Sequence, residues 1–386
     1  MRPIAAMKVL FIGLGGIGQR HLRNLRALLG SSVEVHAYRV RRLSHTLTDQ
    51  LEIEAGADLV RKYDIHVHHD LNAALAAKPS AVFICNPSSL HIQVAMQAAH
   101  AGCHLFIEKP LSHTLEGVDA LIEAVERRAL VGMVGYQLRF HPCLQAVQQQ
   151  LRKGQIGRPL SACVEVGEYL PNWHRYEDYR QMYASRAELG GGVILSQIHE
   201  LDYLFWFFGV PKRVFTAGGR LSSLELDVED VASSILEFDV EGRKVPVHLH
   251  QDYVQRPPSR GCKIIGDDGK VVMSLTNLTV ERYDTKGQVA ENLSFEGFSR
   301  NDLFISELKH FLDCIEGGTK PLVSLRDGAQ SLRMAMAAKA SMNSGEVISP
   351  LTILGNENSN HDLGRREILR PAADPPGSIR LHSSQT

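Results

Sequence analysis

The sequence predicts an α/β protein with two sheets: a doubly wound parallel sheet in the N-terminal part, and then a larger, open and mostly antiparallel sheet with helices of its own. Two observations predict the first sheet. Short apolar runs alternate with amphipathic segments up to residue 135, as in right-handed βαβ units, and glycines cluster directly after the first run. After Gly157, longer stretches alternate apolar and polar residues. This alternation is typical of antiparallel strands with one face in water.

The composition is that of a globular chain without a strong charge bias. Of its 386 residues, 44% are hydrophobic and 22% charged, and the formal net charge is -1. This length allows two domains, and the charge gives no reason to expect nucleic acid or a membrane surface as a partner. No apolar run approaches the roughly 20 residues of a membrane helix, and the first residues are too weakly apolar for a signal peptide. Because the six cysteines are scattered, we expect reduced thiols in a cytoplasmic protein.

The glycine cluster follows an apolar strand at residues 9–12 and opens a predicted helix over residues 19–29. In the spacing G-x-G-x-x-G, the first glycine permits a tight turn, the second lets the backbone approach a pyrophosphate, and the third allows close packing of helix on strand. The start of the helix offers free N–H groups to phosphates. A merely structural turn is the alternative. We expect a dinucleotide to be bound by Gly13, Gly15, Gly16, Ile17 and Gly18.

The second strand, at residues 33–39, bears on the choice of cofactor. NAD-binding units usually end this strand in an acid that holds the ribose 2′-OH. Here Tyr38 occupies that position, followed by Arg39, Arg41 and Arg42. Guanidinium groups suit a 2′-phosphate, so the sequence predicts NADP(H) rather than NAD(H). A solvated basic loop is the alternative.

Two further turns follow predicted strands and therefore lie at the carboxyl edge of the sheet, where open α/β sheets bind ligands. A strand at residues 81–85 leads to Asn86-Pro87, and one at residues 104–107 leads to Glu108-Lys109-Pro110. Pro110 restricts Lys109 to extended geometry, and the bond between them can be cis. A lysine in such a crevice can donate to a substrate oxygen or polarise it. The alternative is a surface ion pair at the start of the next helix.

The sequence offers no convincing metal site. His66, His68 and His69 alternate on a short strand, where histidines more often lie half exposed, and no partner ligands are apparent. Other predicted elements of the first half are helices at residues 71–77, 91–101 and 114–129 and a strand at residues 130–136. A further helix is expected from Gln137 to about Lys153.

The segment at residues 189–209 is predicted as one helix that begins after three glycines and stops at Gly209. One broad face is apolar. Ser196, His199 and Tyr203 lie on the other side at i, i+3 and i+7, with Asp202 near their edge. This polar stripe suggests a cleft, and a histidine hydrogen-bonded at a domain seam is the alternative.

The preceding loop, residues 168–180, mixes aromatic and charged residues, among them Trp173 and His174. Aromatic faces stack on sugars or nicotinamide, and arginines bind phosphates or carboxylates, so we expect this loop to contact substrate. Packing against a neighbouring subunit is the alternative. Later helices are predicted at residues 302–316 and 324–344, and residues 355–386 lack periodicity and are predicted to be disordered.

Together these segments resemble the Gfo/Idh/MocA oxidoreductase family, which includes glucose–fructose oxidoreductase and inositol dehydrogenase. The resemblance runs from about residue 8 to residue 351. It implies a Rossmann domain at residues 1–135, a substrate-binding and oligomerisation α/β domain at residues 136–354, and a homodimer or homotetramer. The motifs that carry it are Gly13-x-Gly15-x-x-Gly18, Asn86-Pro87, Glu108-Lys109-Pro110, Gly135-Tyr-Gln-Leu-Arg139-Phe, and Gly190-Gly-Gly followed by His199-x-x-Asp202.

The resemblance also implies residue roles. Lys109 and His199 match the family's catalytic lysine and histidine, and we expect Asp202 and Tyr203 to assist them. The remaining expected cofactor contacts are Asn86, Pro87, His91, Glu108, Lys109 and Gln137. The expected substrate contacts are Lys109, Arg139, Trp173, His174, Ser196 and His199. Many relatives carry an aspartate where this chain has Ser196, and a serine cannot hold the negative charge that would raise the proton affinity of the histidine. Either the proton relay differs, or Tyr203, Asp202 or a loop residue such as Asp178 substitutes.

The implied function is hydride transfer between a nicotinamide cofactor and a secondary alcohol or ketone of a sugar. The segment at residues 169–203 resembles a branch of the family that is associated with bacterial surface-sugar synthesis, where nucleotide-linked sugars are substrates. Two alternatives stay open. One is a non-catalytic NADP(H)-binding sensor or assembly protein, and the other is a dehydratase or epimerase that recycles tightly held NAD.

Overall fold

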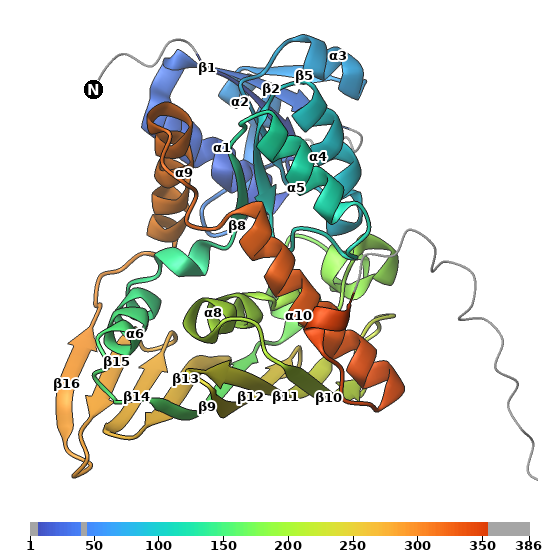
Figure 1. The fold of residues 1–386 in the computed structure, drawn as a ribbon. Helices are drawn as coiled ribbons and strands as arrows, with labels where there is room; N and C mark the ends of the chain where they lie inside the picture. The colour runs from blue at the N-terminus through green and yellow to red at the C-terminus, as the bar shows by residue number, and fades with distance from the viewer. Residues whose placement is uncertain (1–6, 40–44, 354–386) are drawn as a thin grey trace, which may run out of the picture. The chain divides into compact units, whose positions relative to one another are not determined.

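The computed structural model describes residues 7–39 and 45–353. Two sheets organise this part of the chain (Figure 1), and both predicted sheet types are confirmed. No helix within the described residues has the length and apolarity needed to cross a bilayer. The predicted tail at residues 355–386 lies outside the described residues, as do Arg41 and Arg42.

The first sheet has six strands in the order β5-β2-β1-β6-β7-β8, and each neighbouring pair is parallel. The strand order reverses between β1 and β6, and ligands of doubly wound sheets bind at such a switch point. The strands are β1 (Met7–Ile12), β2 (Val33–Tyr38), β5 (Ile65–His68), β6 (Ala81–Ile84), β7 (His104–Glu108) and β8 (Gly132–Gly135). The helices between them are α1 (Gly16–Leu29), α2 (Leu59–Tyr63), α3 (Leu71–Ala76), α4 (His91–His100) and α5 (Val118–Arg127).

A small two-stranded sheet, β3 (His45–Leu47) with β4 (Ile53–Asp58), lies between β2 and α2 in the chain and is separate from the first sheet. The sequence did not predict it. Most side chains of β4 are exposed, so the strand lacks the apolar alternation that marks a half-buried strand.

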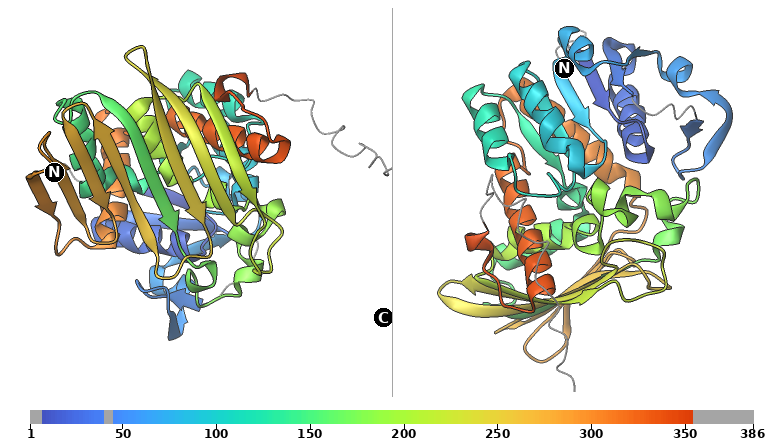
Figure 2. Two further views of the ribbon diagram at one scale, coloured as in Figure 1. Left: turned by 90° about the horizontal axis from the view of Figure 1, so that it is seen from below. Right: turned by 90° about the vertical axis from the view of Figure 1, so that its right-hand side faces the viewer.

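The second sheet has eight strands in the order β10-β11-β12-β9-β13-β14-β15-β16. It is antiparallel except where β12 pairs with β9. The strands are β9 (Pro159–Gly167), β10 (Arg213–Gly219), β11 (Val231–Val240), β12 (Arg243–Asp252), β13 (Ser259–Gly266), β14 (Gly269–Ser274), β15 (Thr279–Tyr283) and β16 (Val289–Ser294). Helices α6 (Pro142–Arg152), α8 (His199–Phe208) and α10 (Leu325–Ser344) lie over one face (Figure 1). No described helix crosses the other face, which is seen from below in Figure 2.

Two helix predictions were wrong in the same way, because each predicted helix is interrupted. The segment at residues 137–153 is a short 3-10 helix (Gln137–Phe140) followed by α6, and the ring nitrogen of His141 caps α6 at the N–H of Cys143. Pro142 has no backbone N–H and suits only the first position of a new helix. The segment at residues 189–209 contains the one-turn α7 (Val193–Ser196) and then α8.

The late helix α9 (Arg300–Gly317) returns to the first sheet and lies beside α1 (Figure 1). Phe311 packs edge-on against Phe83 and Phe106 of the parallel sheet, with ring centroids 5.6 and 5.5 Å away. Serine caps and capping boxes start both α9 and α10, as their sequence pattern predicts. The second half of the chain therefore contributes a helix to the core of the first half.

Candidate active site

A cavity of about 550 Å³ opens between the carboxyl edge of the parallel sheet and the inner side of the second half. Its volume is typical of a small-molecule site. The structure brings most of the predicted site residues to its wall, although the role of each stays a prediction. Those that line it are Gly15, Gly16, Ile17, Asn86, Pro87, His91, Glu108, Lys109, Gln137, Trp173, His174, Ser196 and His199.

The glycine turn has the geometry that a bound dinucleotide requires. Gly13 has φ +92°, and a Cβ there would lie 2.8 Å from the backbone nitrogen of Asn86. A Cβ on Gly18 would lie 2.3 Å from the carbonyl oxygen of Gly13, so α1 packs closely on the turn. No atom lies within 4 Å of the Cβ position of Gly15. This open side, next to the N–H groups that start α1, fits a diphosphate.

The Glu108-Lys109-Pro110 turn is held from several sides. Glu108 is buried, and its Oε1 lies 2.6 Å from Nε2 of the buried His21 on α1. The Lys109–Pro110 peptide bond is cis. His91 lies between two carbonyl oxygens, with Nδ1 3.0 Å from that of Pro110 and Nε2 2.9 Å from that of Asn86. The ring of His91 therefore links the two turns that form this edge of the cavity.

Lys109 extends from the first half to the second. Its Nζ donates to the backbone carbonyl of Ser196 at 2.7 Å and lies 3.5 Å from the hydroxyl of Tyr183. Ser196 ends α7, and His199, which starts α8, also lines the cavity. The predicted meeting of Lys109 and His199 across one crevice is therefore the geometry that the structure shows.

His199 owes its position to the break between α7 and α8. The side chain of Gln197 donates to the carbonyl of Asp252, and the side chain of Gln251 donates to the carbonyl of Gln197. These two bonds attach the break to β12, so that the last turn before His199 does not continue the helix. His199 is 5% exposed, and the ring of Tyr136 stands edge-on to it at 5.7 Å.

Burial holds the pKa of His199 well below the usual value, and the charges of Lys109, Arg260 and Arg300 lower it further. Its Nδ1 is buried without a hydrogen-bond partner among the described residues. The imidazole is therefore neutral near pH 7, which is the state in which it can accept a proton.

Three predicted residues lie elsewhere. Arg139 and Asp202 form a buried, bidentate ion pair, with N–O distances of 2.9 and 2.8 Å, and the hydroxyl of Ser331 also donates to Asp202. Tyr203 is 1% exposed and packs against Phe207. None of the three predicted residues is in the cavity wall. The expected roles of Arg139 in substrate binding and of Asp202 and Tyr203 in catalysis therefore find no support in the geometry.

Many relatives carry an aspartate at the position of Ser196, and no carboxylate among the described residues takes its place here. Asp178 caps a short 3-10 helix on the surface, and Asp202 is occupied by Arg139. The buried hydroxyl of Ser196 instead lies next to that of Tyr253. The charged groups that act on His199 are all cations, so its surroundings disfavour the imidazolium.

The aromatic loop closes the cavity over the glycine turn. Trp173 packs edge-on against Tyr253 at 5.3 Å, and His174 stacks on Tyr176 at 5.4 Å. The phenol oxygen of Tyr176 lies 2.6 Å from where a Cβ on Gly16 would stand. The loop of the second half therefore reaches the first turn of α1.

Several cavity residues carry no local sequence signal that would have identified them. Arg300 starts an amphipathic helix, and Arg260 sits on an alternating strand, where a cation normally faces water. Only the fold turns both toward the same space. Lining residues that the sequence did not single out include Arg20, Tyr183, Gln197, Arg256, Arg260 and Arg300.

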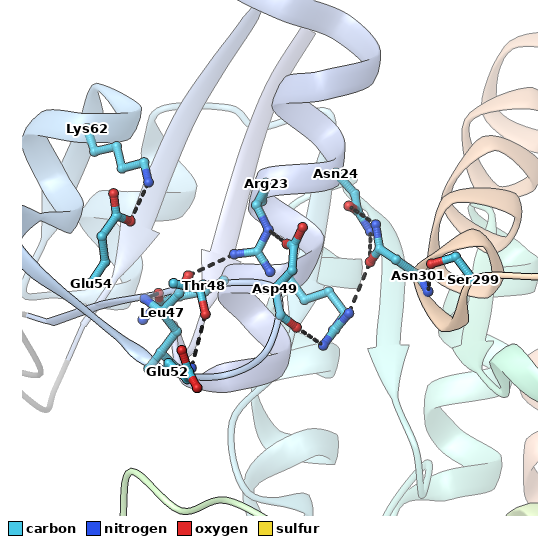
Figure 3. Close-up of polar contacts among 12 residues, drawn as sticks. Arg23, Asn24, Leu47, Thr48, Asp49, Glu52, Glu54, Lys62, Ser299 and Asn301 are labelled. Atoms are coloured by element: carbon cyan, nitrogen blue, oxygen red, sulfur yellow. Dashed lines mark hydrogen bonds and ion pairs between the residues drawn. The ribbon is translucent and has the colours of Figure 1, made fainter.

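The start of α9 is tied to α1 by a small polar network (Figure 3). The side chains of Asn24 and Asn301 exchange two hydrogen bonds of 2.9 and 3.2 Å, and Arg20 donates to Asn301 at 3.1 Å. The hydroxyl of Ser299 accepts from the N–H of Asn301. These contacts fix the backbone on both sides of Arg300.

The other predicted cofactor residues lie beside β2. Arg39 follows the strand, and its N–H donates to the carbonyl of His68 at 3.2 Å. It is not in the cavity wall. His68 also lies 2.7 Å from His36, nitrogen to nitrogen. Within residues 7–39 and 45–353, no group of three or more histidine, cysteine or acidic side chains is arranged to hold a metal ion.

Comparisons with known proteins place these features in a family. The model of an oxidoreductase family with an NAD-binding Rossmann fold matches residues 7–136, and that of the family's C-terminal α/β domain matches residues 148–351. Myo-inositol 2-dehydrogenase of Thermotoga maritima is 25% identical over 358 residues, which are 90% of this chain and 100% of that protein. The scyllo-inositol 2-dehydrogenase (NAD(+)) of Bacillus subtilis is 24% identical over 348 residues, or 86% and 93% of the two chains.

A solved structure shows the same fold at lower sequence identity. The WlbA dehydrogenase from Bordetella pertussis, in complex with NADH and UDP-GlcNAcA, superposes with a TM-score of 0.72 at 21% identity and covers 89% of this chain and 98% of its own. The fold, the glycine turn and the two family models agree with one another. The chain belongs to the Gfo/Idh/MocA oxidoreductase family, with an NAD-binding Rossmann fold and the family's C-terminal α/β domain.

Proposed function

We propose that the protein oxidises a secondary alcohol of a sugar or cyclitol in this cavity, or reduces the corresponding ketone. His199 and Lys109 are the catalytic residues. One observation supports this most directly: Lys109 from the first half and His199 from the second line the same cavity, beside the glycine turn. The names of the relatives support the substrate class, because both relatives compared above are inositol dehydrogenases.

In the oxidative direction the two side chains have different roles toward the alcohol. The neutral imidazole of His199 accepts the hydroxyl proton, and the ammonium of Lys109 stabilises the negative charge that develops on the oxygen. Lys109 is preorganised for this, since the carbonyl of Ser196 holds its Nζ at 2.7 Å. When bound, the nicotinamide supplies the hydride acceptor. In the reductive direction the protonated His199 returns the proton.

The rest of the wall suits a polyhydroxylated ring. Trp173 and Tyr169 offer aromatic faces, and Asn172 and Gln255 offer amide groups that can both donate and accept hydrogen bonds. A nucleotide-linked sugar is an extension of the same proposal, because the WlbA dehydrogenase holds UDP-GlcNAcA in its crystal structure.

The finer choice between NADP(H) and NAD(H) rests on few residues. Tyr38 ends β2 where an acid would favour NAD(H), and Arg39 follows it. The Bacillus relative is named for NAD(+), which argues against the preference for NADP(H) that the arginines after β2 predict. Dissociation constants of NADH and NADPH for the wild type and for Arg39→Ala decide the matter. NADPH binding that is unchanged in Arg39→Ala would remove Arg39 from the assignment.

Pairing of two copies through the open face of the eight-stranded sheet is part of the same proposal. Phe215 on β10 is 42% exposed and lies opposite Ile235 on β11, which is 47% exposed. Leu160 and Ile265 add apolar surface on neighbouring strands of the sheet. Large apolar side chains gathered on an uncovered sheet are typical of an association surface.

The test of the catalytic proposal uses Lys109→Gln and His199→Gln. Each should lower turnover of inositols and related sugars by at least about 10²-fold, because a positioned proton-transfer group is worth about that much. NADH binding should stay unchanged, and Lys263→Gln and His248→Gln, on strands of the open sheet, serve as matched controls. Near-normal turnover in both site variants would refute the assignment. Quenching of bound NADPH fluorescence without any turnover would favour a sensor.

A further inference from the structure

The cavity is rich in positive charge. Lys109, Arg260 and Arg300 lie near enough to His199 to act on it, and Arg256 lines the same cavity. The carboxylates close to them are Glu168, which lines the cavity, and Glu200, which is buried behind Arg260. Even before Lys109 is included, three guanidinium groups face two carboxylates.

Only one of these arginines is neutralised by a direct ion pair with a described residue. Arg260 forms a bidentate pair with Glu200, at 2.8 and 2.9 Å. The guanidinium of Arg256 lies over the ring of Tyr169, 4.0 Å from its centroid, and makes no ion pair with the part of the chain that the structure describes. Stacking of this kind leaves the edge of the guanidinium, with its N–H groups, available for a ligand.

Arg300 is the most exceptional of the three. Its side chain makes no hydrogen bond or ion pair with any described residue, and Glu168 is the carboxylate whose field acts on it. The backbone around it is fixed, because Asn301 is bonded to Asn24 of α1 and Ser299 caps α9 (Figure 3). The side chain is exposed at the cavity wall, so its N–H groups are open to an anionic ligand.

We propose that the substrate carries an anionic group, a carboxylate or a phosphate attached to the sugar, and that Arg300 and Arg256 bind it while His199 and Lys109 act on the alcohol. This inference rests on the proposed function and narrows its substrate class from sugars in general to acidic sugars. Arginine suits such a group because its planar fork can donate two parallel hydrogen bonds.

Arg260 and Arg300 lie near His199, because the charges of both act on its imidazole. Arg300 also lies near Arg20 of α1, so a protein already saturated with NADH is needed to distinguish a substrate anion from the cofactor diphosphate. An anion at Arg300 would also offset the positive field at His199, and so would favour its accepting a proton in the presence of substrate.

The test measures binding to the full-length protein saturated with NADH, by calorimetry at constant ionic strength. The probes are D-glucose, D-glucuronate and glucose 6-phosphate, and L-arabinose, L-galactonate and inorganic phosphate extend the set beyond one sugar. We expect the acidic members to bind at least ten-fold more tightly than the neutral ones, and Arg300→Gln to remove most of this difference. The class of acidic probe that binds more tightly, carboxylate or phosphate, identifies the anion.

The control is Arg213→Gln, which removes a positive charge from the exposed strand β10, outside the cavity. It should retain the preference. Equal affinity for acidic and neutral probes, no binding of any acidic probe, or an Arg300→Gln effect confined to NADH affinity would each overturn the inference. Turnover of neutral sugars without an acid preference would leave the proposed function standing alone. An acid preference without turnover of any sugar would leave the anion site standing alone.

Discussion

The phenol oxygen of Tyr176 lies against the backbone of Gly16, so that a loop of the second half covers the first turn of α1. A Cβ on Gly16 would lie 2.6 Å from that oxygen, which shows how closely the loop approaches the turn. The N–H groups at this helix start are the ones that a diphosphate would use. The hydroxyl of Tyr176 therefore takes up space beside the donors that the diphosphate would use.

Removal of this hydroxyl should strengthen cofactor binding. Tyr176→Phe frees this space for the diphosphate, and a gain of about 0.5–1.5 kcal/mol, the net worth of one hydrogen bond, should lower the Kd for NADH by about two- to ten-fold. Fluorescence titration of NADH measures it, with Tyr283→Phe on strand β15, outside the cavity, as the matched control. Weaker binding in Tyr176→Phe would instead show that the hydroxyl contacts the cofactor.

The pH profile of turnover should reflect the cations around His199. Because burial and then Lys109, Arg260 and Arg300 hold its pKa well below the usual 6.5, the imidazole remains a neutral base as the pH falls to 6. The kcat/KM for alcohol oxidation should therefore show no loss from His199 protonation between pH 8 and pH 6.

Removal of one cation should shift the acid side of this pH profile in a known direction. Arg300→Gln takes away a charge that disfavours the imidazolium, so the pKa of His199 rises and the loss of activity begins at a higher pH. A titration of the His199 ring protons by NMR gives the same answer without substrate. A profile that moves to lower pH, or an equal shift in Arg213→Gln, would contradict the assignment.

The buried pair of Arg139 and Asp202 should matter for stability. Both side chains are almost fully buried, so Arg139→Leu leaves an unpaired carboxylate and should cost about 3–5 kcal/mol in the free energy of unfolding. The double variant Arg139→Leu/Asp202→Leu should cost less than the sum of the two single changes, since it leaves neither charge alone. Urea unfolding measures all three. Additive costs would mean that the two groups do not depend on each other.

Glu307 on α9 should make the protein less stable as the pH rises. Its carboxyl group is fully buried without a partner among the described residues, and burial, followed by the charges of Glu108 and Asp202, raises its pKa well above the usual value. The folded state therefore keeps a proton that the unfolded state loses above about pH 4.5, and stability falls as the pH rises from there. Glu307→Gln should stabilise the protein more at pH 8 than at pH 5, by urea unfolding. Glu316→Gln, exposed on the same helix, should show no such difference.

The open sheet face gives a prediction about assembly. Ile235→Lys places a charge beside Phe215 in the middle of the apolar surface, and it should shift the molecular mass in light scattering toward the monomer. Ile53→Lys, on β4 in the first half of the chain and 54% exposed, is the control. A wild-type protein that is monomeric at micromolar concentration would end this part of the proposal.

Local patterns were sufficient to predict a structure where it depends only on residues that are close in sequence. The glycine turn, the two edge turns at Asn86 and Lys109 and the alternation of the long strands depend on neighbours in sequence, and the structure has them. The helix at residues 189–209 was predicted too long because its apolar face continues through Gln197. The side-chain bonds that break it come from β12, about 50 residues away, and have no counterpart in helical periodicity.

The cationic part of the site depends on partners that are remote in sequence. Arg139 and Asp202 looked like site residues because polar groups on apolar elements suggest a cleft, but each satisfies the other inside the core. Arg260 and Arg300 looked like ordinary surface charges, but the return of α9 and the curvature of the sheet bring them to one space. Arg139 is 63 positions from Asp202 and Arg260 is 60 positions from Glu200, and pairing over such separations cannot be derived from local spacing alone.

The return of α9 also limits how far the two halves can be treated as modules. Leu308, Phe311 and Leu312 complete the core formed by β1, β6 and β7, although they come from the far end of the chain. A fragment cut at residue 135 would leave Phe83 and Phe106 facing water and would be prone to aggregate. Any exchange of nucleotide-binding halves between such proteins must therefore carry residues 300–317 with it, and Arg300 would travel along with the graft.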